Sequence, residues 1–160
     1  MATEDDSPAR RPPAGAWRAL NLALLPCLAL LAACESKQDL SSGDCLPLRA
    51  PAQVTLVREA GLYAVGDAKT PVLSAHPRDT TNDAFHGTRL LRTVLPGTRI
   101  AIERLQQAHG FDVGKGRISA FGTLPGGERF EYGWGGGTTI GRAPWEPLSV
   151  PNLRTVACGD

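Results

Sequence analysis

Two segments with alternating apolar residues flank a Pro-Gly-Gly sequence at residues 125–127. Proline presets the first position of a tight turn, and glycine permits the positive φ that the next position needs. Aromatic side chains opposite aliphatic ones are favourable cross-strand partners. The pattern therefore predicts a β-hairpin formed by residues 116–124 and 128–134. One face of it carries Ile118, Ala120 and Leu124 on the first strand and Phe130, Tyr132 and Trp134 on the second.

The rest of the chain also favours short strands over helices. The 160 residues include 18 Gly and 13 Pro, which favour turns. Several short strands between turn residues are typical of an all-β domain, so we expect a small antiparallel barrel or sandwich. The spacing of residues 95–100 resembles that of small SH3-type barrels, a resemblance that carries no functional residue. The further strands we expect are residues 53–58 and 62–65, paired as a hairpin through 59–61, and residues 72–73, 89–95 and 153–156.

Residues 98–105 are compatible with two structures. Ile100 and Ile102 alternate with charged residues, as in a half-buried strand, whereas Ala101 and Leu105 keep helical spacing. We favour the strand, because the flanking segments have β character.

Residues 19–33, ALNLALLPCLALLAA, form an uncharged apolar run that directly follows Arg18. A basic start, a short apolar run and small residues at its end are the layout of a secretory signal. The run is shorter than the roughly 20 residues that a helix needs to cross a bilayer core. We therefore expect residues 1–33 to be a cleaved signal peptide.

The end of this run, Leu31-Ala32-Ala33-Cys34, resembles the lipobox of bacterial lipoproteins. The resemblance implies that Cys34 is diacylated on sulfur, that the signal is cut before it, and that the new amine is acylated. Several acyl chains hold a protein stably on a membrane. Cys27 follows Pro26, which fits a cleavage site poorly, so we interpret it as part of the discarded signal. In Gram-negative members of that family, Asp after the lipidated cysteine favours retention at the inner membrane. The resemblance therefore implies that Glu35 favours the outer membrane, with the protein facing the periplasm.

Residues 34–44 are polar after the cysteine and include Ser-Ser-Gly, so we expect a flexible tether there. Residues 45–160 then form one β-rich periplasmic domain. Its two cysteines, Cys45 and Cys158, lie at its two ends. In an oxidising compartment they predict a disulfide, the alternative being two unpaired thiols.

No motif in the sequence indicates catalysis. The formal net charge of +1 lacks the basic excess of a nucleic-acid binder. No Gly-x-Ser-x-Gly elbow is present. Asp79, Asp83 and His86 match no metal-binding spacing and favour a solvated loop, and Glu128 and Glu131 are better explained as outer-face charges than as a glycosidase pair. We expect no enzymatic activity, no cofactor and no metal.

Three aromatic residues remain as candidates for a binding surface: Tyr132, Trp134 and Trp145. Aromatic side chains dominate many interfaces, and Trp145 falls in a Pro-rich segment expected to be a loop. The alternative is that Tyr132 and Trp134 belong to the core and that Trp145 closes the end of the barrel. The sequence thus predicts a membrane-anchored envelope lipoprotein whose non-catalytic domain binds a protein or peptidoglycan partner. A second hypothesis is a periplasmic inhibitor or immunity protein that acts on a hydrolase such as lysozyme.

Overall fold

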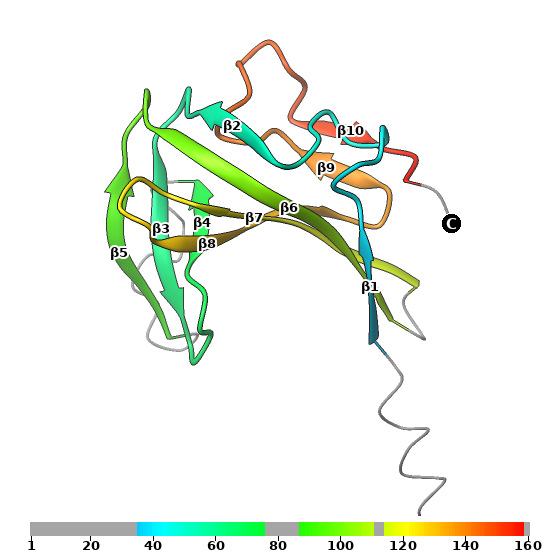
Figure 1. The fold of residues 1–160 in the computed structure, drawn as a ribbon, viewed down its shortest axis with the longest axis horizontal. Helices are drawn as coiled ribbons and strands as arrows, with labels where there is room; N and C mark the ends of the chain where they lie inside the picture. The colour runs from blue at the N-terminus through cyan, green and yellow to red at the C-terminus, as the bar shows by residue number, and fades with distance from the viewer. Residues whose placement is uncertain (1–34, 76–86, 111–113, 159–160) are drawn as a thin grey trace, which may run out of the picture. The chain divides into compact units, whose positions relative to one another are not determined.

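The computed structural model describes residues 35–75, 87–110 and 114–158. All secondary-structure elements in these ranges are β-strands (Figure 1). The all-β prediction is therefore confirmed. These strands are β1 (Glu35–Asp39), β2 (Ala52–Thr55), β3 (Ala60–Val65), β4 (Val72–Ala75), β5 (Thr88–Val94), β6 (Arg99–Gly110), β7 (Gly114–Thr123), β8 (Arg129–Gly136), β9 (Thr139–Gly141) and β10 (Leu153–Thr155).

Three long antiparallel strands, β6, β7 and β8, form the centre of the sheet. Since β7 covers one edge of β6, the strands β1 and β2 share its other edge, β2 along the first half and β1 along the second. The outer edge of β8 is divided in the same way between β4 and β9. The sheet continues from β4 to β3 and β5 on one side, and from β9 to β10 on the other (Figure 1).

The described strands form a mixed sheet that does not close into a barrel. The strand path runs from β1 to β5, and the pairing of β4 with β8 is parallel. Of the expected antiparallel barrel or sandwich, the sandwich-like all-β fold is the one the structure shows, with one parallel strand pair among the antiparallel ones. The long connection between β4 and β8 permits this parallel pairing, which a tight turn could not provide.

The predicted hairpin is confirmed as β7 and β8. Within its turn, Gly126 and Gly127 have φ of 101° and 88°, which a residue with a side chain rarely adopts. Residues 99–105 are strand, as favoured, and lie in β6, which begins one residue after Thr98. The helical spacing there has a physical cause. The β6–β7 register shifts between Ile102 and Arg104, so an extra residue moves the inward face from Ile102 to Leu105.

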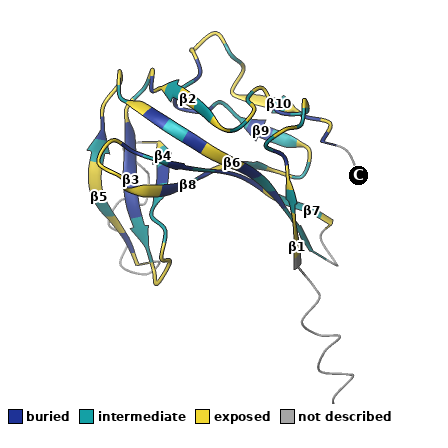
Figure 2. Cartoon of the chain, in the orientation of Figure 1, coloured by how far each residue is buried: buried dark blue, intermediate teal, exposed yellow. Residues whose placement is uncertain are grey.

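The core lies on the inward face of the central strands (Figure 2). Trp134 and Phe130 of β8 are 2% and 1% exposed, and Ile102 of β6 and Ile118 of β7 are fully buried. The flanking strands add their own apolar side chains to the same cluster. These include Leu62 of β3, Leu73 of β4 and Ile140 of β9.

The predicted tether differs from what the structure has at residues 35–44. Residues 35–39 form strand β1, paired with β6, and Leu40 is 4% exposed. The Asp39 carboxylate accepts a hydrogen bond from the Ser41 backbone N–H at 2.8 Å and ends the strand in a local turn. Hydrogen bonds from Ser41 lower the pKa of Asp39. Polar composition concealed this strand because one face of it lies in solvent.

The predicted hairpin of residues 53–58 with 62–65 is wrong. Strand β2 pairs with β6, whereas β3 pairs with β4 and β5. The segment between β2 and β3 does not turn back on itself. Instead Leu56 is 1% exposed, and the backbone N–H groups of Val57 and Arg58 donate to the Pro144 carbonyl at 2.9 and 3.2 Å.

Candidate functional site

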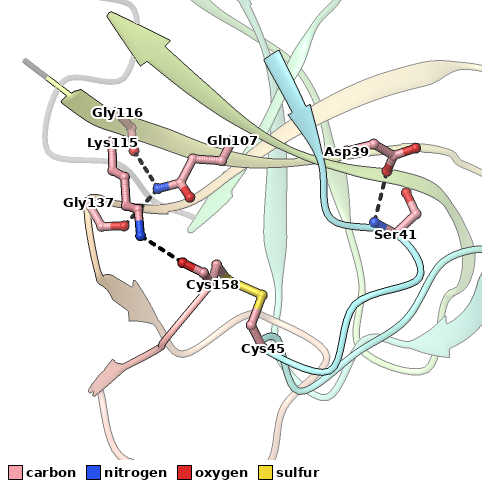
Figure 3. The surroundings of a disulfide bond; sticks show 8 residues. All are labelled: Asp39, Ser41, Cys45, Gln107, Lys115, Gly116, Gly137 and Cys158. Carbon is pink, nitrogen blue, oxygen red and sulfur yellow. Dashed lines mark hydrogen bonds between the residues drawn. A yellow bond between two sulfur atoms is a disulfide. The ribbon is translucent and has the colours of Figure 1, made fainter. Parts of the chain in front are cut away.

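The disulfide between Cys45 and Cys158 is present (Figure 3). The two Cα atoms lie 4.8 Å apart across a sequence separation of 113 residues. The Lys115 ammonium donates to the Cys158 carbonyl at 2.8 Å, which ties the last described residue to β7. Cys34, the predicted lipidation residue, lies outside the described residues, as do Asp79, Asp83 and His86.

The three aromatic candidates lie together, but they face the core. The Trp145 ring makes edge contacts with Tyr132 and Trp134 at centroid distances of 5.0 and 5.5 Å. Trp134 is 2% exposed and its indole N–H donates to the Gly141 carbonyl at 3.0 Å. Trp145 is partly buried against the same core. A partner cannot reach the Trp134 ring in this conformation, so the structure favours the core alternative for this cluster.

Burial also controls the chemistry of the Tyr132 phenol. Loss of hydration raises the pKa of Tyr132 to about 12; nearby Arg58 opposes this shift and Glu146 adds to it. The hydroxyl therefore keeps its proton at neutral pH. A protonated phenol near pH 7 is neither a phenolate nucleophile nor a base.

A buried carboxylate that sequence reasoning missed holds the segment before β10. Glu146, 8% exposed, accepts two hydrogen bonds from the Arg154 guanidinium at 2.7 and 2.8 Å and one from the Ala143 N–H at 2.7 Å. Arg58 donates to the carbonyls of Arg142 and Ala143 at 2.9 and 2.8 Å. These contacts support the loop around Trp145. Among the described residues, the Nε atoms of Arg58 and Arg154 are buried and have no hydrogen-bond partner.

The outer face of the central strands offers a more accessible site, centred on Phe121 of β7. Two hollows meet at this residue, with volumes of about 440 and 280 Å³. The Arg104 guanidinium lies 4.5 Å from the Phe121 ring centre, in cation–π geometry. We call this surface the outer-face groove. Its lining residues are Thr70, Glu103, Arg104, Phe121, Gly122, Arg129 and Phe130 in the first hollow, and Lys37, Gln106, Ala108, Arg117, Ser119, Phe121 and Glu131 in the second.

The charges of the outer-face groove are partly organised by contacts within it. Glu131 accepts a hydrogen bond from the Ser119 hydroxyl at 2.8 Å and lies 3.6 Å from the Arg117 Nε. Arg117 also lies over Gly133, where an added Cβ would come within 2.6 Å of the guanidinium. Glycine at position 133 therefore makes room for the arginine. The cations exceed the carboxylates in the lining, which favours an anionic ligand.

One sequence signal for this groove was available. Alternation in β7 that directs Ile118 and Ala120 inward also directs Ser119 and Phe121 outward. The neighbours contributed by β1 and β6 had no such signal, because their pairing and the extra residue in β6 are long-range features. Glu128 and Glu131 do not act together, since Glu128 pairs with Arg92 at 2.6 Å and Glu131 pairs within the groove.

The described part of the chain holds no group of three or more His, Cys, Asp or Glu placed to bind a metal ion. Nor do the described residues form a helix long and apolar enough to cross a membrane. No protein-family model, curated protein or solved structure matches the sequence. The interpretation of the groove therefore rests on its own geometry.

Proposed function

We propose that this protein is a lipid-anchored envelope protein whose domain binds a protein or peptidoglycan partner in the outer-face groove without catalysing a reaction. The observation that carries the proposal is the meeting of two hollows at Phe121, with Arg104 stacked on its ring. An aromatic ring beside arginines suits a ligand that combines carboxylates with apolar surfaces. Peptidoglycan, with its sugar rings and carboxylate-bearing peptides, has this combination.

Retention on peptidoglycan tests the groove. We expect Phe121→Ala to weaken cosedimentation of the protein with purified sacculi about tenfold or more, as for a central aromatic at an interface. Arg104→Ala should weaken it as well, because its charge and its stacking are lost together. Arg99→Ala is the matched control, since Arg99 is an exposed arginine of the same strand that lines neither hollow.

Equal retention of the wild type and Phe121→Ala on sacculi would contradict this site. Inhibition of lysozyme by a protein that does not bind sacculi would instead support the second hypothesis, a hydrolase inhibitor. Both measurements use the same purified protein, so the two functions are separated directly.

Lipid anchoring is tested at Cys34. We expect Cys34→Ser to remain uncleaved or to leave the membrane fraction, because serine lacks the thiol that carries the diacylglyceryl group. Cys27→Ser is the control, and it should mature and fractionate with membranes like the wild type. Membrane fractionation and the mass of the N-terminal peptide check both variants. A Cys34→Ser protein that still matures and sediments with membranes would overturn the anchor.

A further inference from the structure

The first hollow of the outer-face groove, of about 440 Å³, is lined by two arginines from different strands. Alternation explains both positions. Leu105 and Phe130 are buried, so their neighbours Arg104 and Arg129 are exposed on the opposite face of the sheet. Arg104 lies on β6 and Arg129 on β8, and β7 runs between these strands (Figure 1). Since neighbouring strands lie about 4.8 Å apart, the two guanidinium groups approach the hollow from strands separated by roughly 10 Å.

The charges of this hollow are less fully paired than those of the second one. Neither Arg104 nor Arg129 takes part in an ion pair with another described residue, whereas Arg117 of the second hollow is paired with Glu131. Glu103 is the acidic residue of the first lining, and its carboxylate accepts a hydrogen bond from the Thr123 hydroxyl. Two cations therefore stand against one carboxylate in this lining, which favours a ligand that brings a further carboxylate.

The position of Arg104 favours an acidic group over a sugar ring. Its guanidinium lies over the Phe121 ring, 4.5 Å from the ring centre, and so covers a face on which a sugar would otherwise stack. The N–H donors of a guanidinium lie in its own plane, so stacking leaves them able to bind a carboxylate through two parallel hydrogen bonds. Asp39 also feels this charge, but hydrogen bonds from Ser41 are the main cause of its lowered pKa and Arg104 is the smallest one.

We propose that the first hollow is a carboxylate subsite, in which Arg104 and Arg129 hold an acidic group of the peptidoglycan stem peptide. This inference rests on the proposed function and adds which part of the polymer the groove recognises. The stem peptides carry the free carboxylates of peptidoglycan, whereas the sugars to which they are attached are neutral. Phe121 supplies the apolar surface for the alanine methyl groups of the same peptide.

Removal of the carboxylates from the ligand tests the subsite. Purified sacculi are treated with a carbodiimide and excess ammonia, which convert free carboxylates into neutral amides of similar shape and leave the sugars unchanged. We expect retention of the wild type in cosedimentation to weaken about tenfold on amidated sacculi, because the charge-assisted hydrogen bonds are lost. A soluble stem peptide with free carboxylates should compete with native sacculi, whereas a neutral chitooligosaccharide should not.

Variants of Arg129 assign the effect to the first hollow. Arg129→Ala should weaken retention on native sacculi about tenfold, and it should leave the weaker retention on amidated sacculi unchanged because the charge it binds is already gone. Arg129→Lys should recover only part of the loss, since an ammonium lacks the paired donors of a guanidinium. Arg99→Ala is again the control and should behave like the wild type on both preparations.

The outcomes separate the subsite from the groove. Equal retention of the wild type on native and amidated sacculi would overturn the carboxylate subsite. If Phe121→Ala still weakened retention in that case, the groove would stand and the assignment of its ligand would fall. If Phe121→Ala had no effect on either preparation, the proposed binding site would fail as well. Competition by the chitooligosaccharide and not by the peptide would contradict the proposal and assign the hollow to the glycan.

Discussion

Replacing Trp134 with alanine is expected to lower the free energy of unfolding by about 3–5 kcal/mol. The indole is 2% exposed, contacts the Trp145 ring at a centroid distance of 5.5 Å, and donates to the Gly141 carbonyl. Alanine leaves a cavity that the surrounding strands can only partly fill, and it removes the donor to Gly141. Urea unfolding of the purified protein, followed by far-UV circular dichroism, measures the loss.

Trp134→Phe separates the contribution of ring packing from that of the hydrogen bond to Gly141. Phenylalanine keeps most of the ring volume but cannot donate to Gly141, so we expect a smaller loss of about 1–3 kcal/mol, typical of an acceptor left without its partner. Phe121→Ala should show the opposite profile, with weakened ligand retention and little change in stability, because Phe121 is only partly buried on the outer face. A Trp134→Ala protein as stable as the wild type would mean that the indole is not a core residue.

Local signals in the sequence predicted the local parts of this fold. The β7–β8 hairpin depends on alternation and on a turn whose residues permit the required φ values, and all of these lie within a short stretch of chain. Strands β4, β5 and β10 were likewise found from short apolar runs between turn residues. The Cys45–Cys158 disulfide followed from the number and position of the cysteines.

The errors concern pairings between distant segments. Residues 35–39 are polar and resembled a tether, yet they pair with β6, residues 106–110. Strand β2 was paired with its neighbour in sequence, whereas its partner is the first half of β6. Neither pairing has a local signature, because both are hydrogen-bonded pairings between segments that are distant in the sequence. The extra residue in β6 is likewise seen only in its pairing with β7, and it made the apolar spacing of residues 98–105 resemble that of a helix.

At the candidate site too, the sequence predicted what depends on local signals and missed what depends on long-range contacts. Alternation was sufficient to place Tyr132 and Trp134 on one face, but it did not say which face is covered. On that face the Trp145 ring contacts both Tyr132 and Trp134, and the Glu146–Arg154 pair supports its loop; both contributions come from the C-terminal part of the chain. The uncovered face was therefore the opposite one, which Phe121 shares with Arg104.

Removing the Cys45–Cys158 disulfide should lower the free energy of unfolding by an amount similar to that of Trp134→Ala, but through a different mechanism. The bond joins residues separated by 113 positions. In the chain-entropy model a loop of this length contributes about 4–5 kcal/mol by restricting the unfolded chain. We expect Cys45→Ala/Cys158→Ala to lose up to this amount in urea unfolding. The control is the wild type unfolded and refolded in reductant, which should match the double variant.

The slope of the unfolding free energy against urea distinguishes the two mechanisms. Trp134→Ala changes the native core, so its slope should equal that of the wild type. The double cysteine variant frees the unfolded chain to expand and expose more surface, so its slope should increase, because the slope scales with the surface exposed on unfolding. An unchanged slope with a large loss of stability would place the contribution of the disulfide in the native state. In that case the contact of Cys158 with the core, where it is 4% exposed, would be the stabilising interaction.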